Sequence, residues 1–164
     1  MFDLGDNKIA YYHPGAGYAY ADTRLNAFDC ALLNSGCGNY NLVRVSSILP
    51  PAAERKDHIL LPEGSLLPVA FAELTAAPSS EQEKEISAAV AIGIPSDFSK
   101  VGVIMEHSDF GSENTIRDSV MKMVDKAMET RGLSRAEYKT VCFSTSCMTK
   151  KDQYSTVFAY IAMF

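Results

Sequence analysis

A pair of adjacent serines, Ser46 and Ser47, is the clearest chemical feature of this sequence. The pair lies at the end of a predicted strand, Asn41–Ser47, and Pro50 and Pro51 follow shortly after it. Because proline cannot continue a strand ladder, the two serines can simply be the place where the strand stops. A chemical role is the alternative, and it requires a hydroxyl on the residue that directly follows the attacked carbonyl group.

That chemical role is self-processing of the chain. Where the backbone is strained, the hydroxyl of Ser47 can attack the carbonyl carbon of Ser46 and convert the amide into an ester. Elimination of the ester leaves dehydroalanine, which hydrolyses to a pyruvoyl group with loss of ammonia. A pyruvoyl ketone withdraws electrons from an amine substrate as pyridoxal phosphate does, without a bound cofactor.

Composition and charge narrow the classes of function. The chain has 164 residues and a formal net charge of −5, which argues against nucleic acid as a partner because nucleic-acid-binding domains carry a basic face. Its apolar runs are shorter than the ~18 residues of a membrane span, so no membrane partner is expected. The N-terminal sequence lacks the pattern of a secretory signal, so we expect a cytoplasmic protein with reduced thiols. The cysteines lack the spacing of a zinc site, and we expect no metal.

One long helix is predicted between Ser112 and Arg131. Ser112 suits its N-cap and Gly132 suits its end. Its apolar residues recur at helical spacing and are Ile116, Val120, Met123, Val124, Ala127 and Met128. A shorter helix is predicted after Asn26 as N-cap, with Asp29 at its third position.

The remaining pattern predicts strands. The segment 86–95, ISAAVAIGIP, does not alternate and is typical of a strand buried on both faces. The segment 10–24, rich in glycine and tyrosine, is interpreted as a short strand that becomes a loop. With about six or more strands and two main helices expected, a doubly wound parallel sheet is disfavoured. We expect one α/β or α+β domain over residues 1–164, with two packed sheets and the helices outside.

The segment Leu25–Pro51, LNAFDCALLNSGCGNYNLVRVSSILPP, strongly resembles the cleavage region of the pyruvoyl-dependent arginine decarboxylase family. The resemblance continues in LPEGSLLPVAFAELT, ISAAVAIGIP, GVIMEHS and MVDKAMETRG, and it covers most of the chain in matching order. The chain departs from the family pattern at residues 13–24 and 142–164 and at Cys37, which concerns the wall of the pocket more than the chemistry.

The resemblance implies cleavage between Ser46 and Ser47, which makes residues 1–46 the β chain and 47–164 the α chain of a zymogen. Ser47 would become a covalent pyruvoyl group, with no metal and no pyridoxal phosphate. The substrate L-arginine would form a Schiff base with this group, lose CO2 and leave as agmatine. The reaction would be a step of arginine catabolism, in which agmatine feeds polyamine synthesis or the consumption of a proton serves acid resistance.

The resemblance also assigns roles to Glu106 and Asn41. Glu106, in GVIMEHS, matches the catalytic glutamate that donates a proton, a role that requires burial to keep it protonated. Asn41 matches an asparagine of the processing step, whose amide would hold the Ser46 carbonyl or its oxyanion. The alternative for Glu106 is a solvated carboxylate at the end of a strand. The alternative for Asn41 is an asparagine at a turn that leads into a strand.

Substrate recognition is assigned in the same way. Asp29 matches the family's guanidinium partner, and a carboxylate suits a planar fork of donors. Its alternative role is to stabilise the first turn of the helix. Backbone groups near Gly38 and Tyr40, together with Ser46, would complete the substrate site.

The family fold is a four-layer αββα sandwich that assembles as a homotrimer with active sites at subunit interfaces. Two other functions stay open. The first is the same chemistry on histidine, lysine or ornithine, and the second is an uncleaved, non-enzymatic oligomeric scaffold.

Overall fold

The structure is a computed structural model that describes residues 9–164. In these residues the chain forms two β-sheets and two α-helices. The helices are α1 (Arg24–Ser35) and α2 (Glu113–Thr130), with a short 3-10 helix at Arg135–Glu137. The strands are β1 (Tyr11–Ala21), β2 (Asn41–Arg44), β3 (Ile48–Leu49), β4 (Glu54–Arg55), β5 (Leu66–Ala76), β6 (Glu85–Pro95), β7 (Gly102–Phe110), β8 (Tyr138–Met148) and β9 (Tyr154–Met163).

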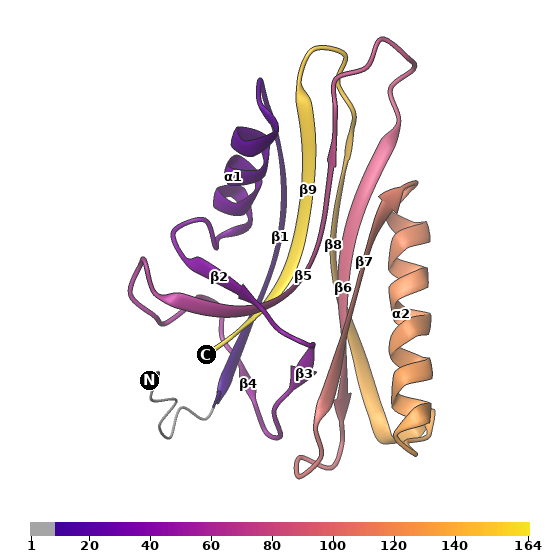
Figure 1. The fold of residues 1–164 in the computed structure, drawn as a ribbon. Helices are drawn as coiled ribbons and strands as arrows, with labels where there is room; N and C mark the ends of the chain where they lie inside the picture. The colour runs from indigo at the N-terminus through magenta and orange to yellow at the C-terminus, as the bar shows by residue number, and fades with distance from the viewer. Residues whose placement is uncertain (1–8) are drawn as a thin grey trace.

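The two sheets pack face to face and enclose the main apolar core (Figure 1). The first sheet has the strand order β2-β5-β9-β1-β4, and the second has the order β3-β7-β6-β8. The core between them includes Tyr12, Ala70, Ala72, Val157, Ala159 and Ile161 from the first sheet and Ile86, Ala88, Val90, Ile92 and Ile104 from the second. Burial of both strands β6 and β9 along almost their whole length explains why neither alternates in sequence.

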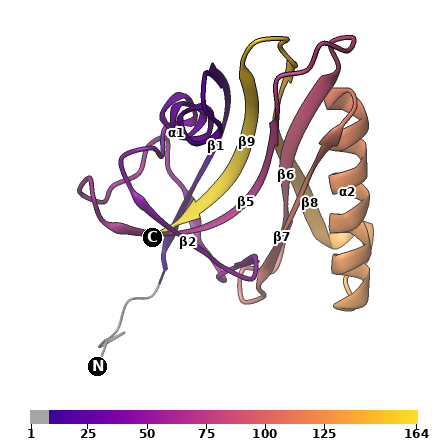
Figure 2. The same cartoon turned by 45° about the horizontal axis from the view of Figure 1, so that its top comes forward.

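Each helix covers the outer face of one sheet, so the layers run helix, sheet, sheet, helix (Figures 1 and 2). Helix α1 packs on β1 and β9 of the first sheet, and α2 packs on β6 and β7 of the second. The prediction of a mixed α+β fold is therefore confirmed at the level of two sheets with helices outside them. Within residues 9–164, neither helix combines the length and hydropathy that a membrane crossing requires.

Helix α2 confirms the predicted stripe with one exception. The Ser112 side chain accepts a hydrogen bond from the Thr115 backbone N–H, as expected of an N-cap. The buried residues are Ile116, Val120, Val124, Ala127 and Met128. Met123, also expected in the stripe, is 42% exposed because it lies at the edge of the packed face.

Helix α1 begins earlier than predicted. Thr23, with extended backbone angles, is the N-cap, and its hydroxyl accepts a hydrogen bond from the backbone N–H of Asn26. The prediction of Asn26 as N-cap is wrong because Asn26 is already helical. Asp29 therefore lies beyond the first turn, where a carboxylate gains little from the helix dipole. The helix-stabilising explanation of Asp29 loses its basis.

Strand β1 corrects another prediction, since Tyr11–Ala21 is a strand along its whole length and pairs with β9. Its glycines reflect close packing with α1. A Cβ atom at Gly15 would come within 2.5 Å of the Ser35 carbonyl oxygen, and one at Gly17 within 2.8 Å of the Ser35 nitrogen. The glycines mark a close approach of helix and strand, which a sequence pattern alone does not separate from a loop.

Candidate active site

The serine pair lies where the chain crosses from one sheet to the other. Strand β2 pairs with β5 in the first sheet, and β3 pairs with β7 in the second, so residues 45–47 bridge the two. The Val45 N–H donates to the Val69 carbonyl at 3.1 Å, and the Ile104 N–H donates to the Ser47 carbonyl at 2.8 Å. The peptide bond between Ser46 and Ser47 is thus held between two anchored points, and the strand predicted to reach Ser47 ends at Arg44.

Ser47 adopts a left-handed backbone conformation with φ of 68°. This region is sterically unfavourable for residues other than glycine, and strain of this type costs of order 1–3 kcal/mol. The hydrogen bonds on either side of the crossing hold Ser47 in this conformation. The structure therefore supplies the local strain that the self-processing hypothesis requires.

The side chain of Ser47 is directed at Glu106. Its hydroxyl lies 3.2 Å from both Oε1 and Oε2 of Glu106, which accept the hydrogen bond. Ile104 of β7 belongs to the core between the sheets, and residues two apart on a strand share a face. Glu106 consequently points toward the first sheet, where the chain crosses, and 22% of its side chain is exposed.

Arg44 connects Glu106 to the first sheet. Its Nη2 atom lies 3.7 Å from Oε1 of Glu106 and donates to the Phe71 carbonyl at 3.1 Å. The guanidinium carbon also lies 4.5 Å from the centroid of the Phe71 ring, within the range of a cation–π contact. These contacts place a fixed positive charge beside the carboxyl group.

Opposing influences act on the Glu106 pKa. Burial raises the pKa of Glu106 above its ordinary value, while the hydrogen bond from Ser47 and the charge of Arg44 act to lower it. The net direction is upward because burial disfavours the ionised form most strongly. The surroundings of Glu106 therefore favour its protonated form more than water does, as the role of proton donor requires.

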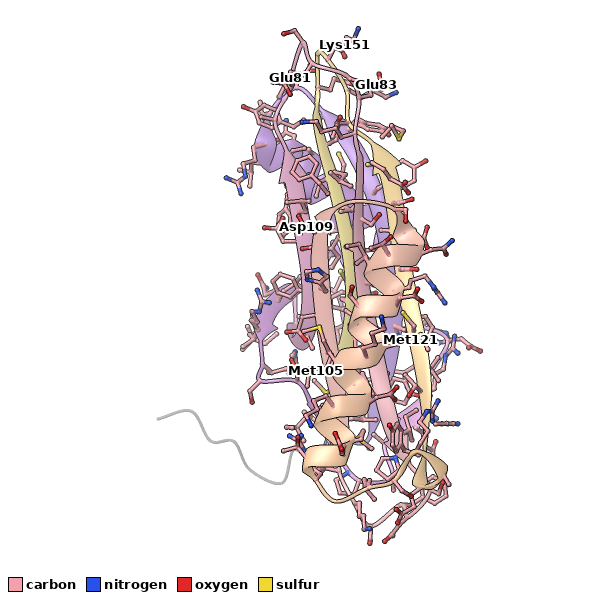
Figure 3. The ribbon with its side chains drawn as sticks, turned by 90° about the vertical axis from the view of Figure 1, so that its right-hand side faces the viewer. Glu81, Glu83, Met105, Asp109, Met121 and Lys151 are labelled. Atoms are coloured by element: carbon pink, nitrogen blue, oxygen red, sulfur yellow. The ribbon has the colours of Figure 1, made fainter. Side chains whose placement is uncertain are left out.

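A cavity of about 460 Å³ opens beside the serine pair. It is lined by Arg44, Val45, Ser46, Ser47, Ile48, Val103, Ile104, Met105, Glu106, Met123 and Arg131. Met123 of α2 and Arg131 at its C-terminal end are among these residues, so the helix forms one side of the cavity. Met105 of β7 lies beside the lower part of α2 in Figure 3. The cavity brings together three of the predicted residues, which are Ser46, Ser47 and Glu106.

The residues expected to bind the guanidinium do not line this cavity. Asp29 is exposed on α1, the layer farthest from the second sheet (Figure 1). The Tyr40 hydroxyl donates to the Leu61 carbonyl at 3.2 Å. Gly38 lies against α1, where an added Cβ atom would come within 2.7 Å of the Leu33 nitrogen.

Asn41 likewise does not line the cavity. Its Nδ2 atom donates to the Gly64 carbonyl at 2.6 Å, and its backbone N–H donates to the Ser65 carbonyl at 2.9 Å. These contacts fix the start of β2. The role of Asn41 in processing stays a prediction.

Two cationic residues of the cavity, Arg44 and Arg131, were absent from the sequence-based site. Arg44 is separated from the serine pair by a single residue, a position that signals proximity in any extended segment. Arg131 carries no such signal, because its place in the cavity depends on how α2 packs on β7.

Comparison with known proteins identifies the family of this chain. The pyruvoyl-dependent arginine decarboxylase (PvlArgDC) family matches residues 11–164. The pyruvoyl-dependent arginine decarboxylase of Methanocaldococcus jannaschii is 43% identical over 117 residues, which cover 71% of this chain and 69% of that protein. The enzyme of the same name from Thermococcus kodakarensis is 36% identical over 151 residues, which cover 92% of both chains. The chain belongs to the pyruvoyl-dependent arginine decarboxylase family.

Proposed function

We propose that this chain cleaves itself between Ser46 and Ser47 and then decarboxylates L-arginine to agmatine and CO2. The cleavage leaves fragments 1–46 and 47–164 associated in one domain. The observation that carries the proposal is the strained Ser47, whose hydroxyl contacts Glu106 at the crossing between the sheets. A pyruvoyl group formed from Ser47 supplies the electron sink for loss of CO2.

The residues present fit the formation of this group. The anchors at Val45 and Ser47 restrict the backbone on either side of the reacting carbonyl. Glu106 accepts the Ser47 hydroxyl proton in a hydrogen bond, which favours attack by the oxygen on the Ser46 carbonyl carbon. Release of strain at Ser47 then favours the cleaved state over the intact chain.

In turnover, Glu106 acts as the proton donor. Conversion of Ser47 removes the hydroxyl that donates to the carboxylate and so removes one influence that lowers the Glu106 pKa. The protonated form of Glu106, which burial already favours, is then favoured further. The same side chain thus accepts a hydrogen bond before cleavage and donates a proton after it.

The substrate guanidinium is bound by Asp29 of a neighbouring subunit, with groups near Gly38 and Tyr40 beside it. The separation of Asp29 from the cavity within one chain supports this part of the proposal. The proposal requires an assembly, which the family resemblance gives as a homotrimer of cleaved protomers, each with the four-layer αββα sandwich. A carboxylate that accepts two hydrogen bonds favours arginine over lysine or ornithine, because an ammonium group lacks the paired, planar N–H donors of a guanidinium.

Mixing two inactive variants tests the shared site. Asp29→Asn and Glu106→Gln are each expected to lose activity, but a coexpressed mixture is expected to recover it. If each site takes Asp29 from one subunit and Glu106 from the next, about a quarter of the sites in a random mixture carry both groups. Agmatine release per enzyme is the measurement. A mixture no more active than either variant would show that both groups act within one chain.

The pH profile tests the protonation state of Glu106. Because the protonated carboxyl is the active form and burial raises its pKa, kcat is expected to fall as pH rises through that pKa. Arg44→Gln removes a charge that lowers the pKa, so this limb of the profile should move to higher pH. Steady-state kinetics on the wild type and the variant provide the comparison. If kcat falls over the same pH range in both, Arg44 does not influence the pKa of the group that controls turnover.

Intact mass spectrometry followed by an arginine assay tests the whole proposal. The expected result is two fragments, with the larger carrying a pyruvoyl terminus, and release of agmatine from L-arginine. Faster CO2 release from histidine, lysine or ornithine would replace the substrate. A single full-length chain that is inert toward hydrazines would instead support a non-enzymatic scaffold.

A further inference from the structure

The cavity beside the serine pair carries more positive than negative charge. Its charged lining residues are Arg44, Arg131 and Glu106. Glu106 is engaged by the Ser47 hydroxyl at 3.2 Å and by Arg44 at 3.7 Å. None of the ion pairs formed within residues 9–164 includes Arg131. One guanidinium therefore lines the cavity without a carboxylate partner from the described chain.

The end of helix α2 does not account for Arg131 by itself. The turn is closed by backbone bonds, in which the N–H groups of Arg131 and Leu133 donate to the Met128 carbonyl at 3.0 and 3.1 Å. The guanidinium adds one hydrogen bond, from Nη1 to the Ala127 carbonyl at 2.9 Å. A guanidinium has five N–H donors in a planar fork, and Arg131 is exposed, so its other donors face water or an acceptor that enters the cavity. A planar, bidentate anion such as a carboxylate matches that fork.

The proposed cleavage delivers such an anion to the cavity at Ser46. Attack of the Ser47 hydroxyl forms the ester and breaks the C–N bond, which leaves an amine on Ser47. Loss of the Ser47 Cα proton and breakage of its Cβ–O bond then free Ser46 as a carboxylate. One water molecule replaces the nitrogen, which leaves as ammonia. A C-terminal carboxyl group has a pKa of about 3.3 and is charged at neutral pH.

We propose that Arg131, with Arg44 lining the same cavity, forms a carboxylate-binding subsite that receives the new C-terminus of Ser46. The inference rests on the proposed self-cleavage. Ser46 and Arg131 line the same cavity but belong to different fragments after cleavage, so their pairing ties the new chain end to the larger fragment. The α-carboxylate of the substrate is a second source of the same group, and the experiment separates the two.

The test compares Arg131→Gln with Lys122→Gln, which removes a positive charge from the same helix outside the cavity. Both variants are expected to cleave as the wild type does. Carboxypeptidase is then added, and loss of Ser46 from the 1–46 fragment is followed by mass spectrometry. Because the subsite is partly open to solvent, removal of Arg131 is expected to speed trimming about threefold to tenfold, and removal of Lys122 not at all. Arg131→Lys, which keeps the charge but loses the fork, should fall between them and replaces the glutamine variant if that fails to fold.

Kinetics assign the occupant if trimming is unchanged. A subsite for the substrate carboxylate predicts a higher KM for L-arginine in Arg131→Gln, with inhibition by agmatine unchanged because agmatine has no carboxylate. If neither trimming nor the KM changes, Arg131 binds no carboxylate and the inference is wrong. A wild-type chain that never cleaves is a different failure, since it overturns the proposed function before Arg131 is tested.

Discussion

Replacement of Ser47 by alanine is expected to leave the chain intact and inactive. The alanine side chain has no oxygen to attack the Ser46 carbonyl, so neither the ester nor the pyruvoyl group can form. Without the electron sink, arginine decarboxylation should fall to background, a loss of at least ~10⁶-fold by the usual scale of enzymatic rate enhancement. Intact mass spectrometry and an agmatine assay on the same preparation measure both effects.

Ser46→Ala is the matched control for this experiment. The attacked atom of Ser46 is its backbone carbonyl carbon, and its side chain is not the nucleophile, so this variant should still cleave. Alanine adopts the left-handed backbone at position 47 at a cost similar to that of serine, so the uncleaved Ser47→Ala chain should still fold. A Ser47→Ala chain that still separates into fragments 1–46 and 47–164 would contradict the proposed nucleophile.

Replacement of Glu106 by glutamine is expected to separate cleavage from turnover. Glutamine keeps a carbonyl oxygen that can accept the Ser47 hydroxyl, so most of the chain should still cleave. Its amide cannot donate a proton as a carboxylic acid does, so kcat should fall by about 10²–10⁴-fold, the usual contribution of a general acid. The measurements are the fraction cleaved by mass spectrometry and kcat per cleaved subunit.

Glu85→Gln provides a carboxylate control in the same sheet. Glu85 is partly buried at the start of β6 and accepts a hydrogen bond from the Glu113 N–H at 3.2 Å, but it does not line the cavity. Its replacement should change neither cleavage nor kcat. Unchanged turnover in Glu106→Gln would remove Glu106 from the proposed role, and loss of cleavage would show that an ionised carboxylate is needed for processing as well.

Some elements of this fold follow directly from local sequence. The stripe of α2 was predictable because a helix buries residues at a fixed angular spacing and a serine cap marks its start. Strand β6 was predictable because its composition of small and branched residues suits burial on both faces. The serine pair was recognisable because its chemistry needs only adjacent residues.

Other features depended on packing that local sequence does not encode. Gly15 and Gly17 lie within a strand because the backbone of α1 comes close to them, and the same glycines in isolation resemble a loop. Thr23 and Asn26 are both suitable caps, and the choice of Thr23 follows from where the chain leaves β1. In these cases a tertiary contact selected one of two locally acceptable structures.

The amino-acid sequence by itself determined the long helix and, through its resemblance to a family, the choice of the serine pair as the candidate cleavage site and of Glu106 as a catalytic candidate. Only the tertiary structure decided that Glu106 contacts Ser47, because the antiparallel pairing of β3 with β7 joins segments far apart in the chain. The crossing between sheets likewise places Ser47 in its strained conformation. The strain at Ser47 and the burial of Glu106 arise from the packing of two sheets and a helix around one cavity. The same packing brings Arg44 and Arg131 to the cavity, and no short segment of sequence encodes it.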